Sequence, residues 1–405
     1  MNKRDLGVKA LQLSDFRKNR VKMACRDTGV DLIVASLPEN LSYLADGYIC
    51  VVQGTMNRST CFIGYNLNTE RFSYVVSYAE IPTVLEHAGY DVDLFTYGVF
   101  RFSQSEDKDN SLSQRLDDES KRRYPDLSQA LVAMFKHNNA SVVALDEERI
   151  SVSDWKKVEA LLPSDMKLIS GTDIFMQARY IKHEDEITGI ERAARVAEDA
   201  LMVALAAYQP GMTEKDIEYL YKREAVRQKA DPFFFVGTAG HRAAYSDTVN
   251  TDYVIQNGDM IRFDFGVKIG GYCSDLARTA VVGKASDKLE RYFSAVKIGM
   301  EEAIKAVRPG ISAEELFKIA VSATQENGIP HYWRHHVGHG IGVEMYDYPT
   351  ISLGAKNILE PNMVINLETP YYEPGWGGVQ VESTIAVTQE SYRVLDVSTI
   401  DLIRI

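Results

Sequence analysis

Four acidic residues lie inside apolar, strand-like stretches of the C-terminal half of this sequence. The stretches read MIRFDFG, CSDLARTAVV, MVINLE and VQVESTIAV, and they carry Asp264, Asp275, Glu368 and Glu382. An ionised carboxylate is costly in a low-dielectric interior, and four that repel one another must take up protons or bind cations. Two divalent ions carry the charge that would neutralise them, so the pattern predicts a dinuclear metal site.

A neutral fifth ligand is available in RHHVGHGIGVEMYDYP, residues 334–349. His339 stands between Gly338 and Gly340, and glycines allow backbone and ligand to approach closely. The alternative is that each acid pairs with an arginine or caps a turn. That alternative explains a single acid more readily than a set of acids that recurs in an internal repeat.

The C-terminal half repeats one pattern of elements. The segment MVALAAYQPGMTEKDIEYLY is echoed by EEAIKAVRPGISAEELFKIA. Each reads as a helix, a Pro-Gly stop, a Thr213 or Ser312 cap with acidic residues after it, and a second helix. The strand NGDMIRFDFG then corresponds to PNMVINLETP. This predicts a duplicated helix–helix–strand–strand unit that places the acids in equivalent positions.

The N-terminal half alternates helix-like and strand-like segments, which predicts a separate domain. FRKNRVKMACRDTGV is typical of an amphipathic helix, and DLIVAS, STCFIGY and SVVALD are typical of buried strands. The pattern predicts an α/β domain over residues 1–178, followed by a second domain over residues 179–405. Residues 103–123 are polar and charged, which predicts a solvated insertion or mobile loop.

Composition excludes several classes of protein. The 405 residues are 45% hydrophobic and carry a net charge of −12, without the clustered Lys and Arg that nucleic acid or an anionic membrane requires. We expect no secretory signal, and no apolar run approaches the roughly 20 residues of a membrane span. The cysteines are scattered, which predicts reduced thiols and a cytoplasmic location: Cys25, Cys50, Cys61 and Cys273.

Other catalytic motifs are absent from the sequence. GHGIG lacks the spacing of a dinucleotide-binding loop. His335 and His339 have the spacing of a zincin pair, but no H-E-x-x-H is present and the glycines argue against a helix. The sequence has no G-x-S-x-G and no convincing Cys/His pair for covalent catalysis.

At these residues the chain resembles the pita-bread metallohydrolases of peptidase family M24: aminopeptidase P, prolidase, methionine aminopeptidase and the metal-free creatinase. The five-ligand dinuclear signature of that family matches Asp264, Asp275, His339, Glu368 and Glu382. The resemblance implies an α/β N-terminal domain and an α+β pita-bread domain with an internal pseudo-twofold repeat. It also implies two divalent ions (Mn, Co, Zn or Fe), bridged by Asp275 and Glu382, and a homodimer whose partner N-terminal domain helps to close the site.

Two proton-handling positions depart from the family pattern. A histidine that precedes the first ligand is replaced by Asp247, and the nearest imidazole is His241. A histidine that follows His339 is replaced by Tyr346. An aspartate accepts from a cation or an N–H, whereas a tyrosine donates or, when activated, abstracts a proton. The alternatives are a loop-capping acid and a packed aromatic. His335 matches a substrate-side histidine of aminopeptidase P.

The predicted function is a dinuclear metal-dependent hydrolase that cleaves a C–N bond in a short Xaa-Pro peptide or in a small amide or amidine. By family analogy Glu368 shuttles the proton, while His335 and Tyr346 stabilise the intermediate or leaving group. Two alternatives remain. The dimethylsulfoniopropionate lyases of this fold share the metal framework but carry an extra aspartate where this chain has Gly266. The second alternative is a non-catalytic pseudo-peptidase that serves as a binding module.

Overall fold

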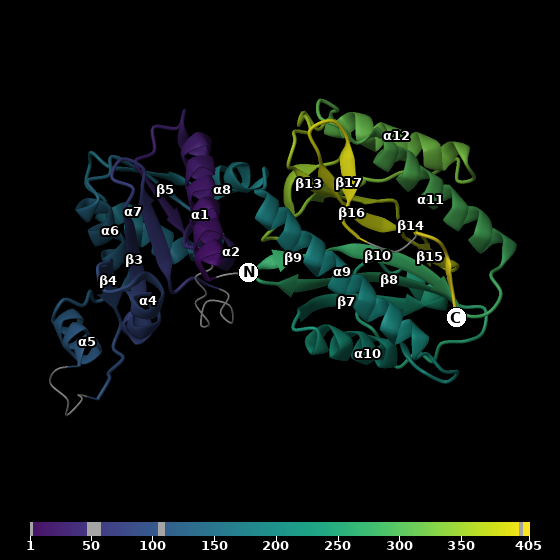
Figure 1. Ribbon diagram of the computed structural model, residues 1–405, viewed down its shortest axis with the longest axis horizontal. Coiled ribbons are helices and arrows are strands. Elements are labelled where there is room, and N and C mark those ends of the chain that lie inside the picture. Colours follow the sequence, from purple (N-terminus) through teal and green to yellow (C-terminus); the bar gives the residue numbers. More distant parts are fainter. Residues whose placement is uncertain (1–2, 47–57, 104–109, 397–399) are drawn as a thin grey trace. The chain divides into compact units, whose positions relative to one another are not determined.

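A computed structural model describes residues 3–46, 58–103, 110–396 and 400–405 of the chain. The chain divides into two compact units, residues 1–178 and 179–405 (Figure 1). Each unit has its own sheet and its own hydrophobic core.

The N-terminal unit is a mixed six-stranded sheet with helices around it. The strand order is β4-β3-β2-β1-β5-β6, and the pairs β3–β4, β1–β5 and β5–β6 are parallel. Its strands are β1 Leu32–Ala35, β2 Phe62–Asn66, β3 Phe72–Ser77, β4 Asp93–Tyr97, β5 Val142–Leu145 and β6 Lys167–Ser170. Its helices are α1 Lys3–Cys25, α2 Pro38–Leu44, α4 Ile81–Ala88, α5 Ser111–Lys121, α6 Leu127–His137, α7 Val152–Leu161 and α8 Thr172–Arg179, with a 3₁₀ turn η1 at Tyr78–Glu80.

The prediction of a loop over residues 103–123 is wrong for its second half, which forms helix α5. Asn110 caps the helix by accepting a hydrogen bond from the Ser113 amide at 2.9 Å. Leu116 is buried, and the carboxylate of Glu119 pairs with Arg115 one turn earlier at 3.1 Å. The cap and the buried Leu116 both support a helix in this polar segment. Residues 104–109 lie outside the described part of the chain.

The C-terminal unit holds a ten-stranded, largely antiparallel sheet. Its main path is β12-β11-β13-β16-β10-β8-β7, with β9, β17 and β18 attached to it, and β14 pairs separately with β15. The strands are β7 Asp231–Ala239, β8 Met260–Ile269, β9 Tyr272–Cys273, β10 Leu276–Val281, β11 Gly338–Gly340, β12 Asp347–Thr350, β13 Val364–Glu368, β14 Tyr371–Glu373, β15 Gly377–Val379, β16 Glu382–Val387, β17 Tyr392–Val394 and β18 Ile403–Arg404. The helices are α9 Glu184–Ala206, α10 Glu214–Arg227, α11 Asp287–Ala306 and α12 Ala313–Glu326, with a 3₁₀ turn η2 at Gly240–Ala244.

The internal repeat appears in the structure as two similar halves of this unit. Helices α9 and α10 pack on the half that contains β7, β8 and β10, and α11 and α12 pack together beside the half that contains β13 (Figure 1). Thr213 caps α10 and bridges to Val254, whereas Ser312 caps α12 and bridges to Ile358. The two halves meet where β10 pairs with β16. The repeat therefore brings equivalent strands to the middle of one sheet.

The described thiols lie in the hydrophobic cores of the two units. Cys25, Cys61 and Cys273 are buried, while Cys50 lies outside the described residues. Among the described helices, none combines the length and the apolar character that crossing a bilayer demands.

Candidate metal centre

The four strand-borne acids converge because their strands are neighbours in the sheet. Asp264 lies within β8, Asp275 directly precedes β10, Glu368 ends β13 and Glu382 begins β16. These elements follow one another in the order β13-β16-β10-β8. Ala277 pairs with both Asp264 and Glu382, and Glu382 also pairs with Glu368. Register alone thus aligns acids that lie more than a hundred residues apart in sequence.

Three of the expected ligands already form a compact donor set. Asp275, His339 and Glu382 each offer one atom, and these atoms all lie within 4.8 Å of one another. Nε2 of His339 lies 3.5 Å from Oδ2 of Asp275. All three residues are buried. Two carboxylates and one imidazole at this spacing are a donor set that suits a divalent cation.

Two glycines hold His339 in this position. A side chain at Gly338 would meet the carbonyl oxygen of Asn366 at 2.0 Å, and one at Gly340 would meet that of Tyr348 at 2.0 Å. Both neighbouring strands therefore press directly against the backbone of β11. In addition, Gly338 has a φ of +147°, which side chains rarely adopt.

The imidazole of His339 is oriented as a ligand would be. Its Nδ1 lies 2.9 Å from the carbonyl oxygen of Gly340, which can only accept, so Nδ1 carries the hydrogen. Burial lowers the pKa of His339 to about 4, so the ring is neutral. The lone pair of Nε2 is then free on the side of Asp275, as metal coordination requires.

The other two acids are joined through the amide of Gln380. Its Nε2 lies 3.2 Å from Oδ2 of Asp264 and 3.4 Å from Oε2 of Glu368. Its Oε1 accepts from Arg262 at 2.9 Å and from the hydroxyl of Tyr372 at 3.2 Å. Donors on one side and carboxylates on the other fix the orientation of this amide. Gln380 thereby holds the two carboxylates on the same side of the sheet.

Arg262 is a fully buried cation beside these acids. It lies two residues before Asp264 on β8, so the two side chains share a face of the strand, and the guanidinium is 3.4 Å from Oδ2 of Asp264. The guanidinium also donates to the backbone carbonyls of Ala243, Tyr245 and Ser246. Through these hydrogen bonds Arg262 holds residues 243–246, which directly precede Asp247, beside the acidic centre.

The acidic centre has the electrostatic character of a cation site. Burial, reinforced by the neighbouring carboxylates, raises the pKa values of Asp275 and Glu382 well above their ordinary range. Burial also raises the pKa of Asp264, and it raises that of Glu368 to about 7 although Arg334 opposes the shift. The ionised centre is thus short of positive charge. Divalent cations would supply that charge, so the residues present fit the metal that the resemblance implies.

Residues around the donor set hold its backbone in place. The amide of Asn366 donates to the carbonyl oxygen of Asp275 at 2.8 Å and to Oε1 of Glu382 at 3.0 Å. The hydroxyl of Thr384 also faces the Asp275 carbonyl, at 3.4 Å. Arg278 binds the Glu382 carbonyl and two further buried carboxylates, Glu198 and Asp396. These bonds fix the backbone that presents Asp275 and Glu382.

The histidine run contributes a residue that the sequence did not single out. Nδ1 of His336 lies 3.1 Å from Oε1 of Glu368, a contact in which one of the two groups must carry the proton. His335 is exposed and packs edge-on against the His336 ring, with centroids 4.2 Å apart. Burial and Arg334 lower the pKa of His335. His336 thus contacts a carboxylate of the centre, and His335 lies outside it.

Tyr346 lies directly on the candidate ligand His339. The two rings stack with centroids 3.9 Å apart and an angle of 30° between their planes. Burial raises the pKa of Tyr346, and Asp275, Glu368 and Glu382 raise it further. Even so, 52% of the residue remains accessible. Tyr346 therefore covers the centre on a side that solvent reaches.

The segment before β8 places Asp247 and His241 differently. Asp247 is exposed, and its charge raises the pKa values of Asp264 and Glu368, so it lies within electrostatic reach of the centre. His241 packs edge-on against Tyr245 and Tyr253, with ring centroids 6.2 and 6.0 Å apart. The described contacts of His241 are with these aromatic rings, and its catalytic role stays a prediction.

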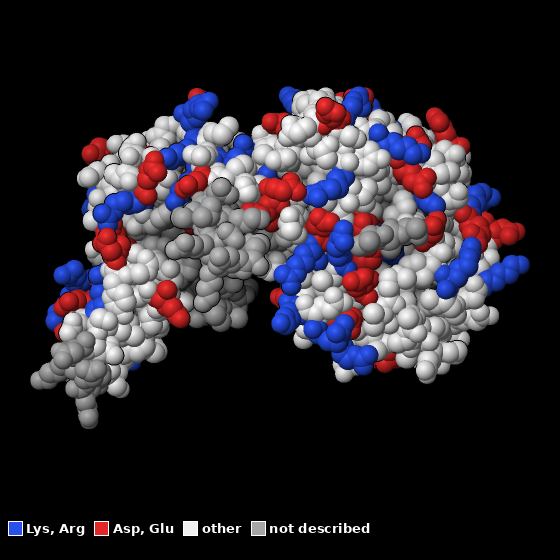
Figure 2. Space-filling view, viewed as in Figure 1, with Lys and Arg blue, Asp and Glu red and all other residues white. Residues whose placement is uncertain are grey.

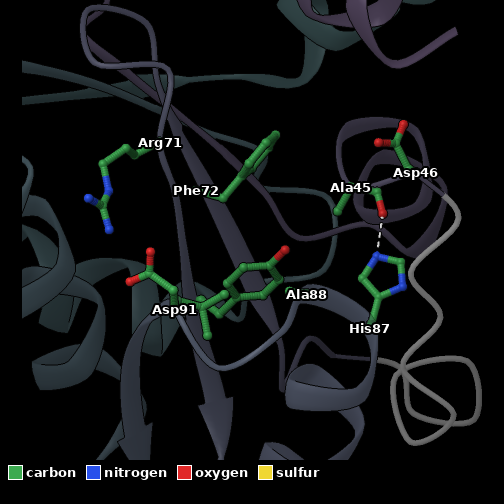
Figure 3. Close-up of a pocket in the computed structure, with 9 residues that line it drawn as sticks. Ala45, Asp46, Arg71, Phe72, His87, Ala88 and Asp91 are labelled. Carbon is green, nitrogen blue, oxygen red and sulfur yellow. Dashed lines mark hydrogen bonds between the residues drawn. The ribbon is translucent and has the colours of Figure 1, made fainter. Parts of the chain in front are cut away.

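Two further surfaces bear on the site assignment. The face of the C-terminal unit in Figure 2 mixes acidic and basic side chains and shows no extended basic patch. The N-terminal unit has an open pocket of about 440 Å³, in which His87 contacts the Ala45 carbonyl at 2.7 Å (Figure 3). That pocket is lined by Ala45, Asp46, Arg71, Phe72, Tyr74, His87, Ala88, Asp91 and Val92. None of the sequence-predicted site residues is among them.

Comparison with known proteins identifies the family. The model of metallopeptidase family M24 matches residues 188–389. An Xaa-Pro dipeptidase of Pyrococcus furiosus is 32% identical over 259 residues, which cover 63% of this chain and 70% of that protein. An Xaa-Pro dipeptidase of Pyrococcus horikoshii is 31% identical over 261 residues, covering 64% of this chain and 70% of that protein. The chain belongs to metallopeptidase family M24 and is a metallohydrolase.

Solved structures confirm the predicted fold class. An Xaa-Pro dipeptidase from Bacillus anthracis superimposes with a TM-score of 0.79 at 22% identity, over 98% of this chain and 100% of that one. An X-Pro aminopeptidase from Thermotoga maritima superimposes with a TM-score of 0.78 at 23% identity, over 96% and 99%. The α/β N-terminal part and the pita-bread C-terminal part are thus both present.

Proposed function

We propose that this chain is a dinuclear, divalent-metal-dependent dipeptidase that hydrolyses the amide bond of Xaa-Pro dipeptides. The observation that carries the proposal is the donor set of Asp275, His339 and Glu382, with one atom of each inside 4.8 Å. Asp264 and Glu368, linked through Gln380, supply the remaining ligands. The substrate class comes from the relatives, which are Xaa-Pro dipeptidases.

When bound in such a site, divalent ions polarise a carbonyl group and make water more acidic. The residues of the chain then have separate tasks. Asp275 and Glu382 lie between the two parts of the ligand set and would be shared by both ions. Glu368 accepts the proton of the attacking water and returns it to the leaving nitrogen, and His336, 3.1 Å from its Oε1, holds that carboxylate in position.

The two residues that depart from the family pattern suit a zwitterionic substrate. Asp247 is exposed beside the centre and accepts hydrogen bonds from the ammonium group of the substrate. Tyr346 stacks on His339 with its hydroxyl group still protonated at neutral pH, because a phenol has a pKa of about 10. It donates a hydrogen bond to the oxygen that gains charge as the carbonyl is attacked. His335 borders the entrance and contacts substrate.

The lyase alternative is disfavoured by packing at Gly266. A side chain there would meet the carbonyl oxygen of Ser274 at 2.2 Å and the ring of Phe234 at 2.3 Å. The Ser274 contact is with a backbone atom, so it can relax only if the chain around Ser274 moves. The extra aspartate of the lyases therefore has no room at this position.

The direct test is hydrolysis of Ala-Pro and Gly-Pro by chelator-treated protein resupplied with Mn²⁺, Co²⁺, Zn²⁺ or Fe²⁺ in turn. We expect turnover with at least one ion, and none after renewed chelation while the circular dichroism spectrum stays native. Acetamide, small amidines and sulfonium acids complete the panel. A protein that binds the ions but turns over none of the panel would be the binding module.

The identity of the ion and the assembly belong to the same proposal. Four carboxylates and one imidazole suit several hard or borderline ions, among which Mn, Co, Zn and Fe are proposed. The homodimer implied by the family resemblance also stays a prediction, and light scattering of the purified protein measures it.

A further inference from the structure

Tyr346 lies in an irregular bend of the chain. The bend covers residues 342–346, between β11 and β12, and none of these residues belongs to a described strand. The ring of Tyr346 stacks on His339, and its hydroxyl group forms no hydrogen bond within the part of the chain that the structure describes. The direction in which this hydroxyl group points therefore depends on how the backbone of the bend is held.

Two acids beside Tyr346 are bound by one buried arginine. Glu344 lies two residues before the tyrosine and Asp347 directly after it, and Nη2 of Arg179 contacts a carboxylate oxygen of each. The distance from Nη2 to Oδ1 of Asp347 is 2.9 Å. The side chains of Arg179 and Asp347 are 2% and 0% exposed, whereas that of Glu344 is 29% exposed. A single guanidinium thus joins the two sides of the segment that contains Tyr346.

Lys182 completes this charged cluster and attaches it to the sheet. Its Nζ lies 3.3 Å from Oδ2 of Asp347, so that carboxylate has a cation at each oxygen. The ion pair lies against the backbone of the bend, because a side chain at Gly342 would meet Oδ2 of Asp347 at 2.6 Å. The amide of Lys182 donates to the carbonyl oxygen of Asn362, just before β13, at 2.9 Å. The cluster therefore connects the bend to the strand that carries Glu368.

The cluster is better suited to fixing a geometry than to adding stability. Desolvation of buried charges largely offsets their attraction, so a buried ion pair contributes little net stability, whereas removal of one partner leaves a costly unpaired charge. We infer that Arg179 is a positioning residue, which holds Glu344 and Asp347 so that the hydroxyl group of Tyr346 points at the centre. The inference rests on the proposed function, in which that hydroxyl group donates to the oxygen that gains charge.

The test is a double-mutant cycle between Arg179 and Tyr346. Arg179→Met should lower kcat for Ala-Pro by about 10- to 100-fold, as for a displacement of about 1 Å, while KM and metal content stay close to those of the wild type. In the Tyr346→Phe background the same substitution should cause no further decrease, because the hydroxyl group that it displaces is already missing. Arg179→Lys, which keeps the charge, should recover part of kcat.

Glu344→Gln covers the case in which Arg179→Met does not fold. It removes one ion pair and leaves Asp347 with both cations, so it should lower kcat in the same non-additive way but to a smaller extent. The control is Arg195→Met, at an exposed arginine of α9, which should match the wild type. A further decrease of kcat in the Tyr346→Phe background, or wild-type kcat in Glu344→Gln, overturns the role of Arg179.

A measurement without substrate tests the same role independently of activity. In Zn²⁺-supplied protein labelled with fluorotyrosine, the fluorine NMR resonance that Tyr346→Phe lacks reports the stack on His339. Glu344→Gln and Arg179→Met should move this resonance toward that of free fluorotyrosine and leave that of Tyr219 in place. An unmoved resonance contradicts the role of Arg179. Absence of dipeptide hydrolysis by the wild type would instead overturn the proposed function, while the resonance still tests whether Arg179 positions the tyrosine.

Discussion

Asp275→Ala is expected to lose bound metal and peptidase activity together. Asp275 is buried, its carboxylate lies 3.5 Å from Nε2 of His339, and it belongs to the compact donor set with Glu382. A metal ion contributes several kcal/mol to transition-state stabilisation, so activity should fall by about 10³-fold or more. Elemental analysis after gel filtration and a dipeptide assay measure the two quantities on the same sample.

Two further variants separate loss of the ligand from loss of the fold. Asp275→Asn keeps the shape of the side chain and the backbone carbonyl that Asn366 and Thr384 bind. It should therefore stay folded and still lose metal. Asp199→Asn, at an exposed position on α9, should behave as the wild type. Full metal content and activity in Asp275→Asn and Asp275→Ala would remove Asp275 from the centre.

Tyr346→Phe is expected to lower kcat by about 10²- to 10³-fold while leaving metal content unchanged. The ring of phenylalanine can keep the stack on His339, in which the centroids are 3.9 Å apart, so the ligand should stay in place. Only the hydroxyl group is removed, and with it a donor to the oxygen that gains charge. The measurement is steady-state kinetics with metal analysis of the same preparation.

The control for this variant is Tyr219→Phe, because Tyr219 is 65% exposed on α10. It should show wild-type kcat. If Tyr346→Phe also turns over at the wild-type rate, Tyr346 serves only to pack on the imidazole. A large loss of metal in Tyr346→Phe would instead assign the residue to the support of His339.

The sequence predicted the arrangement of the acids because the pattern is local. Alternation along a strand identifies the face on which Asp264 lies, and the repeat places Glu368 in the equivalent strand of the second half. The glycines beside His339 were also informative. A Cβ atom at Gly338 or at Gly340 would lie 2.0 Å from a carbonyl oxygen of the neighbouring strand, so both positions require glycine.

The residues that support the acids could not be predicted in this way. Arg262 and Gln380 are far apart in sequence, and they meet only through the register of β8, β10 and β16. His335 and His336 are adjacent, and no local signal decides which of them reaches Glu368. Such contacts depend on the three-dimensional path of the chain.

Helix α5 was missed for a different reason. Its composition is that of a solvated segment, and its stability comes from the Asn110 cap and from Leu116, which is buried against the unit. The hydroxyl of Tyr78, in the turn η1, donates a hydrogen bond to the carbonyl oxygen of Leu116 at 2.6 Å. This bond attaches α5 to another element of the N-terminal unit. Leu112 and Leu116 are the apolar residues of α5, so its sequence shows little of the apolar stripe by which helices are recognised.

The clustered acids and the imidazole of His339 should bind divalent ions, and anomalous diffraction from crystals grown with Mn²⁺ is the direct measurement. We expect two manganese peaks, one beside Asp275, His339 and Glu382 and a second toward Asp264 and Glu368. A difference map without a manganese peak at these residues, from crystals of folded protein, would contradict it.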